Sequence, residues 1–143
     1  MNWYTKIAQS FSSTGTIRIE PKSKSIDVAK SSNWMIIECD PEIARYYMEQ
    51  FNFANRAKNV QLMKPSWGGH ISLVRSEEPP NKELWGQLEG RSVGFTYDPI
   101  VKDNGRNHFY LDVQCNEALD IREQLGLSRN PKYPLHMTIG VRK

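Results

Sequence analysis

Apolar and polar residues alternate along short stretches of this chain, which is the pattern of half-buried β-strands. Residues 34–39 differ, because an almost unbroken apolar run predicts a strand in the centre of a sheet. Residues 16–20 alternate and stop at Pro21, which predicts an edge strand. The other predicted strands are 70–74, 93–97, 109–113 and 135–141.

Between these strands, apolar residues recur at helical spacing. Asp40 and Pro41 supply an N-cap and a proline at the first helical position, so a helix is expected over residues 41–53. Two more helices are predicted, one from a cap at Asn81 to Gly90 and one from a cap at Asn116 to Gly126.

The order of these elements defines the fold class. Helices and strands are interspersed, and the Asp-Asn-Gly sequence at residues 103–105 predicts a hairpin. The fold is therefore expected to be α+β rather than a doubly wound parallel sheet. With 143 residues the chain has room for one core, so we expect a single domain over residues 1–143, of which 1–30 could form an N-terminal extension. A helix followed by a histidine-bearing strand occurs in each half, which is a loose internal repeat.

Composition narrows the classes of function. A net charge of +3 suits a small anionic substrate but does not predict an extended nucleic-acid-binding surface. No apolar run approaches the roughly 20 residues of a membrane-spanning helix, and the first residues lack the layout of a secretion signal. Cys39 and Cys115 are not in a CxxC pair, which favours reduced, buried thiols and a cytoplasmic location.

Two of the three histidines begin the same three-residue pattern. His70 is followed two residues later by Ser72, and His136 by Thr138. Side chains two residues apart on a strand point to the same face, so each strand displays an imidazole beside a hydroxyl and keeps its apolar residues on the other face. The third histidine, His108, lacks the hydroxyl partner.

Two imidazoles beside two hydroxyls suit the cleavage of a phosphodiester bond. The reaction needs a base for the attacking oxygen and an acid for the leaving oxygen, and histidine serves in either role near neutral pH. A hydroxyl donates a hydrogen bond to the phosphoryl oxygens. We therefore expect the two histidines, Ser72 and Thr138 to be catalytic, with no metal ion and no cofactor. Which histidine is the base, and whether water or a neighbouring 2′-OH attacks, stays open.

A loop with a lysine and an aromatic residue precedes each motif. Lys64 and Trp67 precede the first, and Lys132 and Tyr133 the second. A lysine attracts phosphate and an aromatic ring stacks on a base, so these four residues are candidate substrate-binding residues. Packing aromatics and solvated lysines are the alternative. Tyr110 is a fifth candidate, because its strand could turn it toward the same groove; a place on a solvated rim is the alternative.

Competing signatures are missing from the sequence: it has no P-loop, no GxGxxG, no HExxH and no carboxylate cluster spaced for metal ions. Paired H-x-[ST] motifs on strands about half a small chain apart resemble the 2H phosphoesterase superfamily, and the likeness covers residues from about 34 to 143. The resemblance implies a two-lobed α+β fold, with antiparallel sheets around a central groove lined by both motifs. His70, Ser72, His136 and Thr138 match the catalytic positions. The serine departs from the threonine that is frequent in the first motif, but it keeps the hydroxyl.

The flanking residues resemble a narrower group. Residues 67–75, the Glu-Glu-Pro-Pro sequence at 77–80 and residues 135–140 are similar to phage anti-CBASS nucleases, 2H enzymes that degrade the cyclic di- and trinucleotide signals of bacterial defence. This resemblance implies a metal-independent hydrolase of small cyclic oligonucleotides, which would act in the host cytoplasm if the chain is viral.

Two alternatives to this activity remain. One is an RNA 2′,3′-cyclic phosphodiesterase acting on RNA ends. The other is a non-catalytic nucleotide-binding sponge, which the two histidines disfavour because binding alone does not require an acid and a base. The bases, ring size and linkage of the substrate stay open, as does the oligomeric state.

Overall fold

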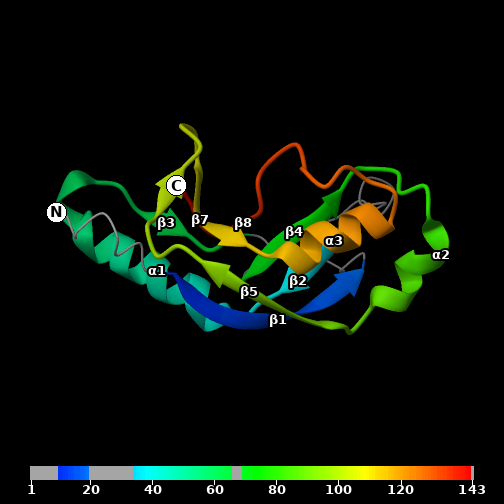
Figure 1. The fold of residues 1–143 in the computed structure, drawn as a ribbon. Coiled ribbons are helices and arrows are strands. Elements are labelled where there is room, and N and C mark those ends of the chain that lie inside the picture. The colour runs from blue at the N-terminus through cyan, green and yellow to red at the C-terminus, as the bar shows by residue number, and fades with distance from the viewer. Residues whose placement is uncertain (1–9, 20–33, 66–68, 143) are drawn as a thin grey trace, which may run out of the picture.

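The strands of this protein pair into one antiparallel sheet (Figure 1). The structure, a computed structural model, describes residues 10–19, 34–65 and 69–142. Its strands are β1 (Phe11–Ile19), β2 (Trp34–Glu38), β3 (Leu62–Met63), β4 (His70–Arg75), β5 (Ser92–Tyr97), β6 (Lys102–Asp103), β7 (His108–Gln114) and β8 (His136–Arg142). Their order is β3-β8-β4-β2-β1-β5-β7-β6, and a further pairing of β8 with β7 closes six of them into a barrel.

In the described ranges, three α-helices accompany the sheet: α1 (Pro41–Ala54), α2 (Lys82–Trp85) and α3 (Asn116–Gln124). The start of α1 is as predicted, since Asp40 accepts a hydrogen bond from the backbone N–H of Glu42 at 3.0 Å. Asn81 occupies the N-cap position of α2 as predicted, but without a capping hydrogen bond, whereas the cap predicted at Asn116 is wrong. The thiol of Cys115, rather than Asn116, accepts from the first turn of α3, and the Asn81 amide donates to the carbonyl of Gln124 instead of capping its own helix.

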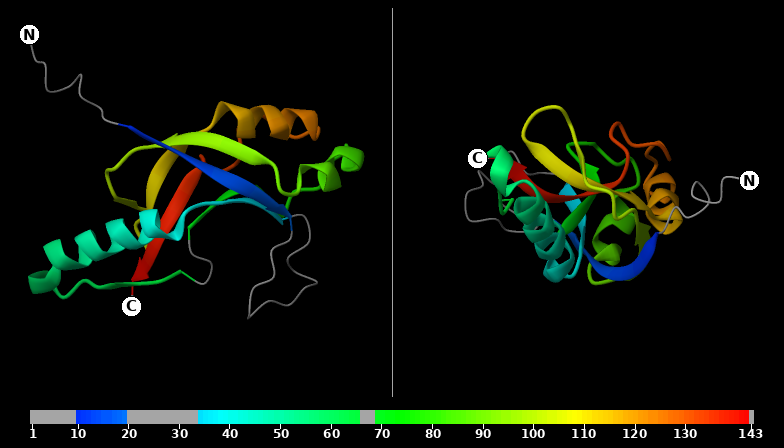
Figure 2. Two further views of the ribbon diagram at one scale, coloured as in Figure 1. Left: turned by 90° about the horizontal axis from the view of Figure 1, so that it is seen from below. Right: turned by 90° about the vertical axis from the view of Figure 1, so that its left-hand side faces the viewer.

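The two longer helices lie at opposite ends of the sheet (Figures 1 and 2). Helix α1 contacts β8 and β3, whereas α3 contacts β5 and β4. The helices and alternate strand residues share one hydrophobic core. Its strand members include Ile17, Met35, Ile37, Ile71, Leu73, Val93, Phe95, Leu111, Val113, Met137 and Ile139, and its helix members include Ala44, Ala118 and Ile121.

The predicted α+β class agrees with the structure, and so does the central position of the strand at 34–39, since β2 lies between β4 and β1. The edge position predicted for residues 16–20 is wrong. β1 pairs with β2 on one side and with β5 on the other, so it lies in the interior of the strand order. These pairings of β1 also make the strands one continuous sheet, whereas the resemblance implies separate antiparallel sheets around a groove.

Both cysteines are buried free thiols, as predicted. Burial raises the pKa of Cys39 to about 12, so this thiol stays protonated and inert near neutral pH. Within the described ranges, no helix has both the length and the apolar character needed to cross a membrane.

Candidate active site

The two histidine motifs lie on neighbouring strands, as the sequence predicts. β4 and β8 are antiparallel, with Ile71 opposite Met137, and both of these residues are fully buried in the core. His70 and His136 each precede one member of this pair and are half-buried. Because successive strand residues alternate between faces, both imidazoles lie on the face opposite the core.

The β4–β8 register places the polar residues of one motif opposite those of the other motif. Extending the pairing of β4 and β8 by one residue in each direction sets His70 opposite Thr138 and Ser72 opposite His136. Side chains directly opposite each other have Cβ atoms about 4.5–5.5 Å apart, and diagonal neighbours such as the two histidines about 7–8 Å. The strands thus place each imidazole beside the hydroxyl of the other motif, on one face of the sheet.

A glycine turn positions His70 at the start of β4. Gly69 has a φ of +62°, and a Cβ there would lie 3.2 Å from the Cα of Pro41 and 3.3 Å from the carbonyl oxygen of Cys39. The carbonyl of Gly69 accepts a hydrogen bond from the N–H of Cys39 at 2.7 Å. Only glycine combines this backbone conformation with such a close approach, so the turn holds β4 against the junction of β2 and α1.

Trp34 contacts both polar residues of the first motif. Its ring meets the His70 imidazole edge-on, with centroids 5.9 Å apart and planes at 86°. Its Nε1–H donates a long hydrogen bond to Ser72 Oγ at 3.5 Å. Trp34 is 8% exposed, yet it lies outside the main core because it shares the histidine face of β2 with buried Ile36. The sequence analysis assigned Trp34 only to a central strand and missed this contact.

His136 is oriented by a backbone carbonyl. Its Nδ1 lies 2.8 Å from the carbonyl oxygen of Pro134. A carbonyl can only accept, so Nδ1 carries the proton and Nε2 is left to exchange a proton with a substrate. Tyr110, opposite Thr138 on β7, contacts the other side of the ring, with centroids 5.3 Å apart and planes at 64°. The structure therefore brings Tyr110 to the second motif.

A charged pair adjoins the second motif, and the sequence analysis did not single it out. Asp112 is the cross-strand partner of His136, and Lys102 of β6 is the partner of Tyr110. Lys102 forms an ion pair with Asp112, and this hydrogen-bonded carboxylate raises the pKa of the lysine. A sequence signal existed, because Asp112 follows Tyr110 by two residues on a strand and must share its face.

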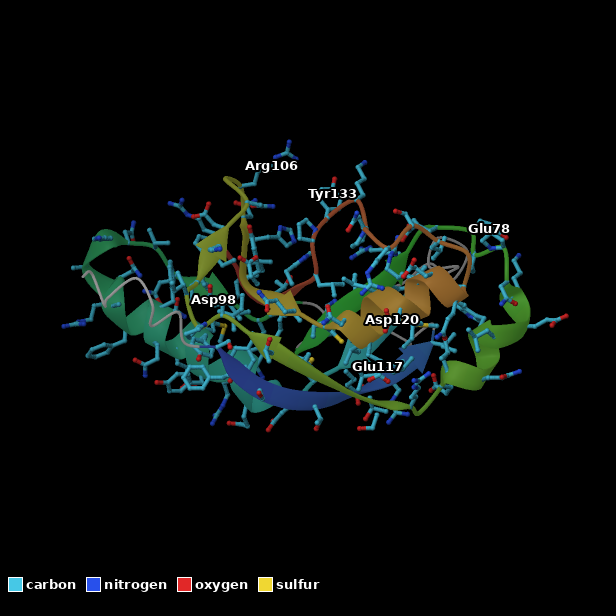
Figure 3. The ribbon with its side chains drawn as sticks, viewed as in Figure 1. Glu78, Asp98, Arg106, Glu117, Asp120 and Tyr133 are labelled. Carbon is cyan, nitrogen blue, oxygen red and sulfur yellow. The ribbon has the colours of Figure 1, made fainter. Side chains whose placement is uncertain are left out.

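The other flanking candidates are less tightly placed. Lys132 and Tyr133 are exposed and stack on each other, with Nζ 5.5 Å from the ring centroid. Tyr133 projects from the loop that leads into β8, on the same side as Arg106 of the β6–β7 loop (Figure 3). Lys64 is exposed and follows β3, which pairs with the end of β8 away from His136, so it is not brought to the histidines. Trp67 lies outside the described residues.

Metal-binding clusters were sought across the described part of the chain. Among those residues, no group of three or more His, Cys, Asp or Glu side chains is arranged to hold a metal ion. Arg122 is a charged residue that is buried among the described core residues. Its guanidinium group forms an ion pair with Glu77, which follows the end of β4. This ion pair lies outside the histidine face and supports the fold.

Comparison with protein families, with curated proteins and with solved structures finds no match to this chain.

Proposed function

We propose that this protein is a metal-independent phosphodiesterase of the 2H type, with His70 and His136 as its acid and base. One observation carries the proposal: the β4–β8 register sets each histidine opposite the hydroxyl residue of the other motif, on a face that the core does not use. Chance placement of two polar pairs on strands does not require them to be neighbours, in register and on the same face.

In the proposed reaction, one imidazole removes a proton from the attacking oxygen and the new P–O bond forms. The other imidazole donates a proton to the leaving oxygen as the old P–O bond breaks. The Nδ1–H bond of His136 to Pro134 leaves Nε2 as its reacting nitrogen. Ser72 and Thr138 donate hydrogen bonds to the phosphoryl oxygens, where charge grows in the transition state.

The proposed substrates are cyclic di- and trinucleotides, whose hydrolysis would counter the CBASS signalling of a bacterial host. The resemblance of the motif-flanking residues to anti-CBASS nucleases supports this substrate class. The contact of Tyr110 with His136 adds an aromatic ring where a base could stack, and Lys102 adds a cation on the same face. RNA ends with 2′,3′-cyclic phosphates are the alternative substrates.

The repeated element order also fits a 2H-type fold. In each half a helix comes before the histidine strand, α1 before β4 and α3 before β8. The two strands meet at the β4–β8 pairing, and the two helices lie at opposite ends of the sheet (Figure 1). The resemblance implies two lobes of similar α+β topology with both motifs lining a central groove, and the repeated helix–strand order supports this part of the proposal.

The test is a substrate panel in EDTA. The purified protein is incubated with cyclic dinucleotides, cyclic trinucleotides and RNA carrying 2′,3′-cyclic ends, and the products are identified by mass spectrometry. We expect linear products from the cyclic oligonucleotides, at the same rate with and without the chelator. Cleavage of RNA ends alone would select the alternative substrate class, and tight binding without products would indicate a sponge. Activity that disappears in EDTA and returns with zinc, magnesium or manganese would contradict metal independence.

A further inference from the structure

Away from the histidines, the described residues line an open hollow with a volume of about 380 Å³. It lies where the start of α1 meets the first residue of β1 and the last residue of β5, which face each other in register. Its lining residues are Phe11, Glu42, Ile43, Tyr46, Tyr47 and Tyr97. None of them belongs to the histidine face, so the proposed phosphodiesterase does not use this hollow.

The aromatic rings of the hollow face in different directions. The Tyr46 and Tyr47 centroids are 5.0 Å apart with planes at 89°, and those of Tyr47 and Tyr97 are 6.1 Å apart with planes at 83°. Phe11 lies 5.9 Å from Tyr97 at 32°. Rings that stand nearly perpendicular to each other do not sandwich a flat base between two parallel walls, whereas a rounded group can meet ring faces from several directions. The angles therefore disfavour a nucleobase and favour a compact, rounded occupant.

The rim of the hollow carries a carboxylate. Glu42 pairs with Arg45, and both the 2.7 Å and the 3.0 Å contacts from this arginine reach Oε2. Glu49 also lies within 3.9 Å of Arg45, so the acidic charges on this stretch of α1 outnumber the basic one. Tyr47 is a neutral phenol near neutral pH, since burial raises its pKa to about 12.

Two of the rings are left open to solvent, with Phe11 44% exposed and Tyr46 56% exposed. Exposed aromatic rings around a hollow with an acidic rim attract cations, because each ring face is the negative side of its quadrupole. We propose that this hollow binds a compact organic cation of the alkylammonium class, a small molecule with a quaternary or fully protonated amine head. The site is independent of the histidine chemistry.

The test compares two molecules of nearly the same shape. Choline carries a trimethylammonium head, and 3,3-dimethylbutan-1-ol is its uncharged carbon counterpart. Each is titrated into the full-length protein while the ring resonances of the tyrosines are followed by NMR. We expect saturable shifts at Tyr46 and Tyr47 with choline, and roughly ten-fold weaker binding of the neutral molecule. Equal affinities, or no shifts with choline, would overturn the proposal.

Variants locate the binding and separate it from the active site. Tyr46→Leu removes an exposed ring but keeps an apolar side chain, so it should weaken choline binding several-fold without unfolding the protein. Phe53→Leu is the matched control, because this ring is 67% exposed on the same helix and outside the hollow. Glu42→Gln should weaken choline and leave the neutral molecule unaffected, whereas His136→Ala should change neither. Unaltered choline binding in Tyr46→Leu would also overturn the proposal.

Discussion

The two histidine motifs share a sequence pattern, but their surroundings are built differently. His70 meets the edge of a buried indole, and the same indole donates to Ser72. His136 is tied through Nδ1 to the carbonyl of Pro134, meets Tyr110, and has Asp112 as its cross-strand partner. Each imidazole has a carboxylate residue as a cross-strand partner, Glu38 for His70 and Asp112 for His136, so the difference lies in the buried indole beside one ring and the Pro134 carbonyl beside the other.

The residues that are proposed to react are equivalent in the two motifs, whereas the residues that contact them are not. Both histidines and both hydroxyls occupy equivalent places in the β4–β8 register, so their removal is expected to have similar effects on turnover. The supports are not equivalent, since Trp34 contacts two polar members of its motif whereas Tyr110 contacts the imidazole of His136 and lies opposite Thr138. Changes at the supports are therefore expected to have unequal effects. Similar effects are therefore expected at the histidines and at the hydroxyls, and unequal effects at Trp34 and Tyr110.

The largest effects are expected at the histidines. His70→Ala and His136→Ala should each lower kcat by about 10²–10⁴-fold, because each removes a general acid or base. Substrate affinity, measured by calorimetry, should change little, and circular dichroism should show an intact fold. The control is His108→Ala, which alters an exposed histidine outside the motifs and should keep full activity. Full turnover in either motif variant would remove the basis of the phosphodiesterase proposal.

Smaller effects are expected at the hydroxyls. Ser72→Ala and Thr138→Ala should lower kcat by roughly 10–10²-fold with little change in KM, because each removes a donor to charge that develops in the transition state. Ser72→Thr should retain most activity, since it keeps the hydroxyl. A rise in KM with an unchanged kcat would show that the hydroxyls bind the ground state instead. A large difference between Ser72→Ala and Thr138→Ala would break the proposed equivalence of the motifs.

A buried brace next to the first motif, beyond the end of β4, should affect stability rather than chemistry. Arg122 is 1% exposed and donates to the carbonyls of Leu73 and Ser128 and, with both ends of its fork, to Glu77. Glu77→Gln should lower the free energy of unfolding by about 1–2 kcal/mol, the lower part of the range for charged hydrogen bonds, because the Glu77 side chain is 35% exposed. Glu123→Gln, in an exposed pair with Arg129, is the control with a smaller effect.

The brace has a defined pH dependence. The hydrogen bond from Arg122 lowers the pKa of Glu77 below its ordinary value of 4.5. The carboxylate therefore stabilises the fold fully above about pH 4.5, and this contribution is lost as the pH falls through the lowered pKa. Urea unfolding of the wild type and Glu77→Gln should differ at pH 7, and the difference should shrink below pH 4.5. A difference that stays constant down to pH 2 would contradict the ion pair.

The sequence predicts most of this fold because its signals are local. Pro41 and the Asp40 cap define the start of α1 through contacts within a few residues. Alternation also separates the core face from the histidine face on β4 and β8 without any knowledge of the pairing. The cap at Asn116 failed because the neighbouring Cys115 thiol accepts from the Ala118 N–H, and Asn81 makes no capping bond because its amide donates to the distant backbone carbonyl of Gln124.

The pairing partners could not be predicted, because strand order depends on contacts between distant residues. Nothing within residues 16–20 reveals that β1 has neighbours on both sides. Trp34 was missed for the same reason, since an apolar run hides which of its members turn away from the core. Tyr110 was found because it shares a strand face with a histidine, but its contact is with His136 on another strand.

The smallest and most unequal effects are expected at the two aromatic supports. Trp34→Phe keeps a ring beside His70 but removes the donor to Ser72, so kcat should fall several-fold; Tyr110→Phe keeps the ring against His136 and should change kcat less than two-fold. A double-mutant cycle isolates the cause. In a Ser72→Ala background, Trp34→Phe should lower kcat no further, because the hydroxyl that the indole positions is already gone. Unfolding midpoints of all four proteins control for loss of packing at this buried site. Additive losses would show that Trp34 acts through the His70 contact or through general packing, and the indole would then have no role in aligning Ser72.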